Sequence, residues 1–287
     1  MNSPQISSAI RQQVQQAREA SLVLASLDNS AKNKILHELA KSLRENSAEI
    51  LAENSRDMVE AEKMLESGEL SESACKRVLL NEDKIEQMAK NCESVAALAD
   101  PSGQVLQATR LDEGLELFRV SCPIGVILVI FESRPDVVIQ ISALALKSGN
   151  AVILKGGKEA QYSNVIIATT LQSVLEKNNL PKELISLLPD SSREGVAKLI
   201  KMDKYVDLIV PRGGEALIQY VSSNATVAVV KHDKGQCHTY IDRDANIENA
   251  IKIAINAKVQ RPGVCNSMET LLIDGYIAPD IMIKVQE

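Results

Sequence analysis

Apolar residues in the first hundred positions recur every three or four residues, which is the spacing of one face of a helix. One such stripe runs over residues 6–27 and a second over residues 35–43. Asn46, followed three residues later by Glu49, has the form of a capping box and predicts the start of a third helix. Asn81, with two acidic residues after it, predicts the start of another. We therefore expect the N-terminal third to be helical.

The pattern changes after the turn cluster at residues 100–103. Residues 115–120 alternate between apolar and polar side chains, as in a half-buried strand. Beyond Cys122, continuous apolar runs alternate with stretches of helical periodicity. The expected strands cover residues 125–131, 151–154, 184–188, 206–210 and 226–230, and the expected helices cover residues 136–147, 162–175 and 191–202. Strands that alternate with helices at this spacing predict an α/β fold with a doubly wound, mainly parallel sheet.

The composition of the 287 residues is that of a globular protein, with 45% hydrophobic and 24% charged residues. This length allows one large domain or two of ordinary size. A formal net charge of −6 and an aromatic content of 2% both argue against a nucleic-acid-binding protein. No apolar run approaches the ~20 residues that span a bilayer, and the polar start does not have the form of a secretory signal. We therefore expect neither nucleic acid nor a membrane as a partner.

The cysteines are odd in number and widely separated along the chain. They are Cys75, Cys92, Cys122, Cys237 and Cys265. No two have the spacing of a zinc ribbon or a C-x-x-C motif, so no metal site is predicted. Free thiols in a reducing cytosol are the natural interpretation. Cys75, Cys92 and Cys122 are interpreted as buried structural residues, the commoner fate of a cysteine.

Four short segments follow the expected strands, at the edge where doubly wound sheets bind ligands. They cover residues 132–135, 155–158, 211–214 and 231–235. Most of their residues are basic or glycine. We therefore expect positive charge to be concentrated at this edge of an otherwise acidic chain.

The segment Pro211-Arg212-Gly213-Gly214 is the strongest candidate for a phosphate cradle. Glycines let the backbone come close to an anion, and the free amides of a following helix donate to it. An ordinary strand-to-helix turn explains the same residues about equally well. The G-x-G-x-x-G fingerprint of a standard Rossmann site is absent from the sequence.

The segment Lys155-Gly156-Gly157-Lys158 follows the second expected strand. A carboxylate near the end of the second strand commonly binds the ribose 2′-hydroxyl of NAD, and none lies within this segment. Lysines there favour the 2′-phosphate of NADP. A pair of solvated lysines is the alternative interpretation.

Cys265 lies in a loop that also contains Arg261, a proline and a glycine. A thiol at the start of a helix and close to an arginine gains thiolate character, so Cys265 is a candidate nucleophile. A buried structural cysteine is the alternative. Cys237 and His238 are adjacent on an expected strand and point to opposite faces, which argues against a direct dyad.

Three segments of the chain closely resemble one enzyme family. They are PIGVILVIFESRPDVVIQISALALKSGNAVILKGGKEA, DLIVPRGGEALI and QRPGVCNSMETLLI. The resemblance is to the gamma-glutamyl phosphate reductases, also called glutamate-5-semialdehyde dehydrogenases, of the aldehyde dehydrogenase superfamily. It extends over nearly the whole chain, and the long middle motif together with the cysteine loop is highly specific.

The resemblance implies an NADPH-dependent reduction of L-glutamyl 5-phosphate to L-glutamate 5-semialdehyde, the second step of proline biosynthesis from glutamate. Cys265 matches the family's nucleophile, and its backbone amide, with Asn266, would stabilise the oxyanion. Either Arg134 or Arg261 is expected to hold the substrate phosphate. The residues expected at the cofactor are Lys155, Gly156, Gly157, Lys158, Pro211, Arg212, Gly213 and Gly214.

The resemblance also implies a cytoplasmic enzyme that is a homo-oligomer when full length, with glutamate 5-kinase as a partner. Residues 1–110 would be the N-terminal helical part of the cofactor domain, residues 111–240 the Rossmann-like NADP-binding domain, and residues 241–287 the start of the catalytic domain. Members of the family continue well past the cysteine, whereas this chain ends at Glu287, 22 residues after Cys265. A partial chain with an incomplete catalytic domain is therefore expected.

Two departures from the hydrolytic members of the superfamily bear on the reaction. Glu132, Ser133 and Arg134 stand where those relatives place the asparagine of the oxyanion hole, so the local arrangement must differ. Residues 231–234 stand where they carry a general-base glutamate that activates water, and its loss fits phosphate rather than hydroxide as the acyl partner. The open alternatives are an acylating aldehyde dehydrogenase for another acyl phosphate or a CoA thioester, and an inactive nucleotide-binding fragment.

Overall fold

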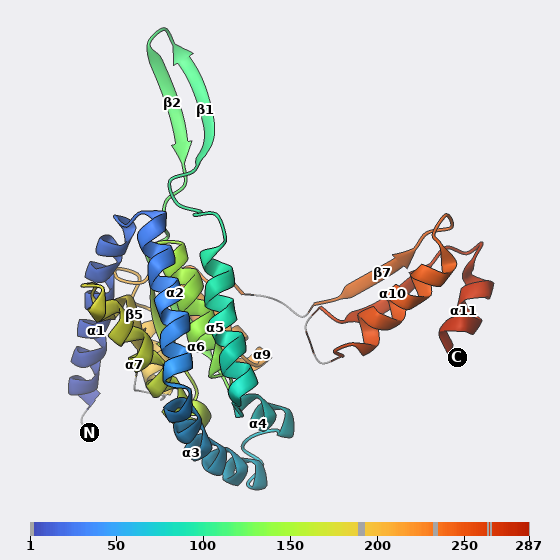
Figure 1. Cartoon of the computed structure of the whole chain (residues 1–287), viewed down its shortest axis with the longest axis horizontal. Coiled ribbons are helices and arrows are strands. Elements are labelled where there is room, and N and C mark those ends of the chain that lie inside the picture. Colours follow the sequence, from blue (N-terminus) through green and yellow to red (C-terminus); the bar gives the residue numbers. More distant parts are fainter. Residues whose placement is uncertain (1–2, 189–192, 232–234, 263, 265, 287) are drawn as a thin grey trace. The chain divides into compact units, whose positions relative to one another are not determined.

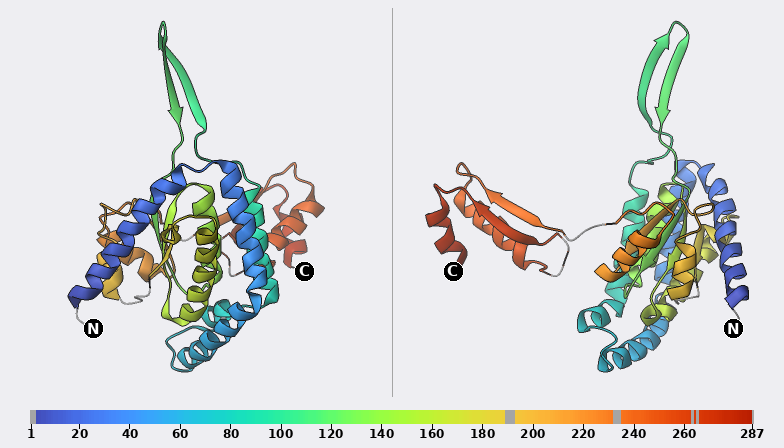
Figure 2. Two further views of the ribbon diagram at one scale, coloured as in Figure 1. Left: turned by 60° about the vertical axis from the view of Figure 1, so that its left-hand side comes forward. Right: turned by 180° about the vertical axis from the view of Figure 1, so that it is seen from behind.

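The computed structural model describes the chain except for residues 1–2, 189–192, 232–234, 263, 265 and 287. The chain forms two compact units, Met1–Lys231 and His232–Glu287 (Figures 1 and 2). The expected domain limits at residues 110 and 240 concern function and stay predictions.

A four-stranded parallel sheet, counted over the described residues, is the centre of the larger unit, with the strand order β5-β4-β3-β6. In chain order the strands are β3 (Val126–Phe131), β4 (Ala151–Lys155), β5 (Ile185–Leu187) and β6 (Leu208–Arg212). All of β4 is buried, and so is β3 except for the half-buried Ile127. Continuous apolar runs are typical of strands that are covered on both faces. The predicted doubly wound α/β fold is confirmed.

A helix follows each of these strands. They are α6 (Asp136–Lys147) after β3, α7 (Gln161–Lys177) after β4 and the short η1 (Lys158–Ala160), α8 (Arg193–Leu199) after β5, and α9 (Glu215–Asn224) after β6. A second short helix, η2 (Lys182–Leu184), leads into β5. The predicted helices over residues 136–147 and 162–175 are confirmed. The helix predicted from residue 191 is shorter, and that predicted start lies outside the described residues.

The N-terminal part is helical, as predicted. Its described helices are α1 (Ser3–Ala25), α2 (Asn29–Glu45), α3 (Ser47–Glu66), α4 (Glu72–Val78) and α5 (Glu82–Ala96). Their apolar stripes pack into the same core as the sheet: α2 lies against α5, α6 and α7, and α1 lies against β4 and β5. The predicted start at Asn81 is confirmed, because its side chain accepts a hydrogen bond from the Lys84 amide at 2.9 Å.

The third helix begins directly after Asn46, as predicted, but the predicted capping box is wrong. The Asn46 side chain makes no capping hydrogen bond to α3. Instead, Asn46 Nδ2 donates to the Ser42 carbonyl oxygen at 2.7 Å, at the C-terminal end of α2. Asn46 is the only residue between the two helices, and its side-chain amide can bond either to the C-terminal end of α2 or to the N-terminal end of α3. The spacing in the sequence does not separate these two uses.

An antiparallel hairpin of β1 (Val105–Asp112) and β2 (Leu115–Val120) projects from the larger unit (Figure 1). The alternation over residues 115–120 correctly predicts a strand, but the prediction that it is half-buried is wrong, because every residue of β2 is exposed. β1 is not predicted from the sequence. Alternation separates the two faces of a strand and does not show whether another layer covers either of them.

The strand predicted over residues 226–230 is wrong as a regular strand. It is reduced to one parallel bridge between Val229 and Ile209 of β6. The Ile209 amide donates to the Ala228 carbonyl at 2.8 Å, and the Val230 amide donates to the Ile209 carbonyl at 2.9 Å. The next donor along β6 would be Pro211, which has no N–H, so the ladder ends there.

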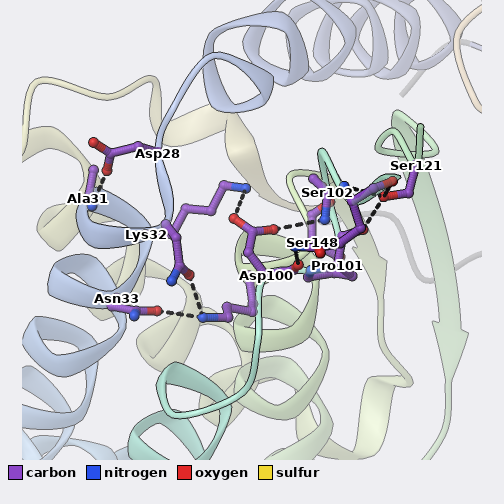
Figure 3. A network of polar contacts seen from close by, with 12 residues as sticks. Asp28, Ala31, Lys32, Asn33, Asp100, Pro101, Ser102, Ser121 and Ser148 are labelled. Atoms are coloured by element: carbon purple, nitrogen blue, oxygen red, sulfur yellow. Dashed lines mark hydrogen bonds and ion pairs between the residues drawn. The ribbon is translucent and has the colours of Figure 1, made fainter. Parts of the chain in front are cut away.

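A buried polar network lies where α5 leads into the hairpin (Figure 3). Lys32 Nζ, on a residue that is 2% exposed, is 2.9 Å from Asp100 Oδ2, and the Ser102 amide donates to Asp100 Oδ1 at 2.9 Å. Lys147, also 2% exposed, donates to the side-chain oxygens of Asn29 and Asn33 at 2.7 and 2.6 Å. Burial alone would raise the pKa of Asp100, but the donors that surround it lower the pKa overall. Burial lowers the pKa of Lys147.

The interpretation of three cysteines as buried is correct for Cys75 and Cys92 and wrong for Cys122, which is exposed. Burial raises the pKa of the Cys92 thiol to about 12. Cys122 lies in the connection between β2, which ends at Val120, and β3, which begins at Val126, so it is outside the core formed by the sheet. No helix in the described part of the chain is both long and apolar enough to cross a membrane.

The smaller unit pairs β7 (Cys237–Ile241) in parallel with β8 (Met268–Ile273). Between the two strands lies α10 (Ile247–Val259), and α11 (Ala278–Gln286) follows β8. Among the described residues of this unit the buried apolar core is small, with Ile241, Ala254 and Ile281.

Candidate functional site

The carboxyl ends of β3, β4 and β6 meet at one edge of the larger unit. Ile130 of β3 is in register with Lys155 of β4, and Phe131 of β3 is in register with Arg212 of β6. The segments 132–135, 155–158 and 211–214 therefore begin side by side. The structure brings these three expected segments together, whereas most of the fourth segment, 231–235, lies outside the described residues.

The Gly213-Gly214 pair forms the start of α9, and an anion already binds it. The Gly214 amide donates to Glu132 Oε2 at 2.9 Å. A Cβ on Gly213 would collide with the same carboxylate and would lie 2.8 Å from Leu217 Cδ2. The segment thus presents a backbone donor to a carboxylate of the chain itself, and its assignment as a phosphate site stays a prediction.

A second carboxylate fixes the neighbouring loop. Glu159, in η1, is 7% exposed and accepts hydrogen bonds from the amide and from the hydroxyl of Ser133, the latter at 2.9 Å. Ser133 has a φ of +48°, which a serine adopts at a cost. A Cβ on Gly157 would collide with the Glu159 carboxylate. Glu159 therefore ties the loop after β3 to the loop after β4.

Two of the expected cations at this edge are ion-paired. Lys158 Nζ lies 2.8 Å from a carboxylate oxygen of Glu69, and this hydrogen bond raises the pKa of Lys158. Arg134 Nη2 lies 2.7 Å from Asp136 Oδ2. The expected concentration of positive charge is therefore accompanied by carboxylates of the same chain. Lys155 is buried, at 8% exposure, at the end of β4.

The start of α7, directly behind this edge, is held by α3. Asp57, which is 1% exposed, accepts hydrogen bonds from the amides of Tyr162 and Ser163 at 3.0 and 2.7 Å. Burial is the largest influence on the Asp57 carboxyl and raises its pKa. Asn54 Nδ2 donates to Ser163 Oγ at 2.9 Å. These contacts anchor the loop 155–160 at its far end.

Sequence reasoning misses the two glutamates that shape this edge. Glu132 is recognised only as a residue of the segment that replaces an asparagine, and Glu159 resembles an ordinary acidic residue in the first turn of a helix. The one usable signal is position: Glu132 directly follows β3, and Glu159 lies two residues after the glycine pair Gly156-Gly157. The direction in which each glutamate side chain points depends on the backbone of the folded loop.

The residues expected to carry the chemistry belong to the smaller unit. Cys265 lies outside the described residues, and Asn266 and Arg261 are exposed. The segment expected after the cysteine loop, helical or apolar, is the apolar strand β8, which begins at Met268. The helix start used in the argument for a thiolate is not found among the described residues of this loop. The apolar run from residue 268 fits a strand as well as a helix, and its length of six residues favours the strand. Arg134, the other candidate for the substrate phosphate, belongs to the larger unit.

A model of the aldehyde dehydrogenase family matches residues 5–287. The chain belongs to the aldehyde dehydrogenase family. The gamma-glutamyl phosphate reductase of Sulfurovum sp. (strain NBC37-1) is 58% identical over 274 residues, which are 96% of this chain and 66% of that protein. The corresponding protein of Sulfurimonas denitrificans is 59% identical over 265 residues, with 92% and 64% covered. The chain thus spans about two thirds of the length of these aldehyde dehydrogenase relatives, and the resemblance seen in its motifs is confirmed.

Solved structures agree with this assignment. The gamma-glutamyl phosphate reductase of Thermotoga maritima superposes with a TM-score of 0.87 at 38% identity, covering 96% of this chain and 67% of that one. The Saccharomyces cerevisiae enzyme of the same name gives 0.71 at 35% identity, covering 100% and 70%. An acetylating aldehyde dehydrogenase from Geobacillus thermoglucosidasius, at 21% identity and a TM-score of 0.65, shows the shared aldehyde dehydrogenase fold alone.

Proposed function

We propose that the protein reduces L-glutamyl 5-phosphate to L-glutamate 5-semialdehyde and phosphate with NADPH. The observation that carries the proposal is the 58% identity over 274 residues to a gamma-glutamyl phosphate reductase. The Cys265 loop supports it, since a cysteine is the residue that such chemistry needs as a nucleophile.

The proposed reaction has two halves. The Cys265 thiolate attacks the acyl carbon, the bond from that carbon to the phosphate oxygen breaks, and phosphate leaves with the electron pair. The resulting thioester is then reduced, and the carbon–sulfur bond breaks to give the aldehyde and the thiolate. In each half the backbone amide of Cys265, with Asn266, stabilises the oxyanion. The bound cofactor supplies the hydride of the second half.

The larger unit fits the role of cofactor domain in this proposal. The Gly214 amide donates to the Glu132 carboxylate at 2.9 Å, and Gly213 leaves space beside it, which supports an anion site here. Lys155, Gly156, Gly157, Lys158, Pro211 and Arg212 complete the set of residues that we assign to the cofactor. Membership of the family supports a nicotinamide dinucleotide, and the lysines of the 155–158 segment support NADP over NAD.

The remaining assignments are part of the same proposal. Arg134 or Arg261 binds the substrate phosphate, glutamate 5-kinase is a partner, and the protein works as a homo-oligomer in the cytoplasm. The absence of paired cysteine motifs from the sequence supports the cytoplasmic location. Residues 1–110 and 111–240 serve the cofactor, and residues 241–287 begin the catalytic domain.

The test is the reverse reaction, with the protein as its gene encodes it. Glutamate 5-semialdehyde, NADP and phosphate are supplied, and NADPH formation is followed by its absorbance. Activity that requires phosphate and is lost in Cys265→Ser supports the proposal. Activity that persists in Cys265→Ser overturns the nucleophile. Equal activity with CoA in place of phosphate favours an acylating aldehyde dehydrogenase, and NADPH binding without turnover favours a nucleotide-binding fragment.

A further inference from the structure

Glu132 reaches from one strand end to the next. Its backbone amide donates to the Arg212 carbonyl at 3.3 Å, and its side chain accepts from the Gly214 amide at 2.9 Å. The first amides of a helix have no partner within the helix and carry partial positive charge, so a carboxylate is a favourable partner for them. The amide that the proposed cofactor phosphate needs is therefore satisfied within the chain.

The space beside that amide is also filled by Glu132. A Cβ on Gly213 would collide with the Glu132 carboxylate, and a Cβ on Gly214 would lie 3.9 Å from Glu132 Oε2. A phosphate oxygen at hydrogen-bond distance from the Gly214 amide would meet the carboxylate at van der Waals distance or closer. Two anions at such a separation repel one another, so binding of the phosphate requires the carboxylate to leave.

The Glu132 side chain can rotate away from the Gly214 amide, whereas the Glu159 side chain is held in place. Glu132 is an exposed residue, and its carboxylate has one described donor. Glu159 is 7% exposed, and Ser133 donates to it twice. Rotation of the Glu132 side chain breaks one hydrogen bond and leaves the loop in place, because Glu159 keeps hold of Ser133.

We propose that Glu132 is a specificity-determining residue whose carboxylate competes with the cofactor phosphate for the Gly214 amide. The competition lowers the affinity of the cradle for anions in general, so that a ligand binds well only if it makes further contacts elsewhere. This inference rests on the proposed function, because it takes the segment 211–214 as the cofactor cradle.

The first test compares binding of NADPH, followed by its fluorescence, to the wild-type protein, Glu132→Gln and Glu132→Ala. We expect binding to tighten about tenfold in each variant, which corresponds to about 1.4 kcal/mol. Glu215→Gln is the matched control: it removes the same charge one residue beyond Gly214, and its carboxylate accepts from Gln219 Nε2 at 3.1 Å. There we expect less than about a threefold change, because an exposed charge that does not occupy the amide is screened by solvent.

The second test observes the amide directly and needs no enzymatic activity. The chain has 13 glycines, so ¹⁵N-glycine labelling gives a sparse NMR spectrum in which the Gly214 amide is assigned by Gly214→Ala. We expect inorganic pyrophosphate to shift the Gly214 signal at about tenfold lower concentration in Glu132→Gln than in the wild type, since a neutral acceptor holds the amide less strongly.

The outcomes separate the two proposals. NADPH binding to the wild type that is unchanged or weakened in Glu132→Gln overturns the competition and leaves the cofactor site standing. Equal tightening in Glu132→Gln and Glu215→Gln also overturns it, because general charge would then explain the effect. A pyrophosphate response at Gly214 that increases in Glu132→Gln without NADPH binding supports the competition and overturns the cofactor assignment. No response of Gly214 to either ligand in any variant overturns both.

Discussion

Replacing Asp100 with asparagine should strongly destabilise the larger unit. Asp100 Oδ2 lies 2.9 Å from the Nζ of Lys32, and the two side chains are 12% and 2% exposed. The substitution keeps the shape of the residue and removes the negative charge that a buried ammonium group faces. Breaking a buried ion pair on one side costs roughly 3–5 kcal/mol. We expect a loss near the lower limit, because asparagine keeps an oxygen for the Ser102 amide, which now binds Asp100 Oδ1 at 2.9 Å.

The assay is urea unfolding at pH 7, followed by far-ultraviolet circular dichroism. Glu72→Gln is the matched control, because Glu72 pairs with Lys76 at 2.6 Å while both side chains are more than 70% exposed. An exposed pair of this kind contributes roughly 0–1 kcal/mol, so the control should unfold close to the wild type. A free energy of unfolding for Asp100→Asn within about 1 kcal/mol of the control would refute the reasoning.

The same pair predicts a dependence on pH. The pKa of Asp100 is lower in the folded protein than its ordinary value, so the unfolded chain takes up a proton at a higher pH than the folded chain does. The stabilisation is therefore complete above the unfolded pKa of about 4 and is lost as the pH falls through the lower, folded pKa. The difference in stability between the wild type and Asp100→Asn should accordingly shrink below about pH 4. A difference that grows on acidification would contradict this sign.

Three further predictions concern single residues. Asn81→Ala removes the acceptor of the Lys84 amide and should lower the free energy of unfolding by roughly 0.5–2 kcal/mol in a urea titration; Asn81→Ser should recover most of the loss. Gly213→Ala should abolish NADPH binding measured by fluorescence while circular dichroism stays unchanged, because its Cβ fills the space that the Glu132 carboxylate leaves and that the cofactor phosphate would then need; unimpaired binding would place the cofactor elsewhere. Cys265→Ser should lose turnover by at least about a thousandfold while keeping NADPH affinity, and a loss of affinity instead would point to a structural thiol.

The sheet of the larger unit could be predicted because burial on both faces leaves continuous apolar runs, as in β3 and β4. The prediction of a fifth strand was wrong because of a single residue, Pro211. Pro211 is visible in the sequence, but its effect on pairing depends on which neighbour its missing N–H would have faced. The hairpin failed for a related reason, since the pattern of β2 does not reveal that nothing in the described chain covers it.

The sequence predicted where the main chain of the candidate site lies, but not the directions of the side chains around it. Glycines after strands mark places where a ligand can approach the main chain, and Gly213 and Gly214 are such a place. The sequence does not show that Glu132 reaches across to Gly214 while Glu159 holds Ser133. Those directions depend on the positive φ of Ser133 and on the register of three strands, which only the folded chain determines.

The exposure of Cys122 has a practical consequence for thiol chemistry on this protein. A maleimide or iodoacetamide reagent meant to report on Cys265 would also modify Cys122, since an accessible thiol reacts once it is deprotonated. Alkylation that is complete at one equivalent would therefore not identify the nucleophile. Cys122→Ser supplies the background for such labelling. The reverse variant, Cys265→Ser, leaves Cys122 as an exposed attachment point for a fluorophore near the hairpin, with the half-buried Cys237 as the thiol to control for.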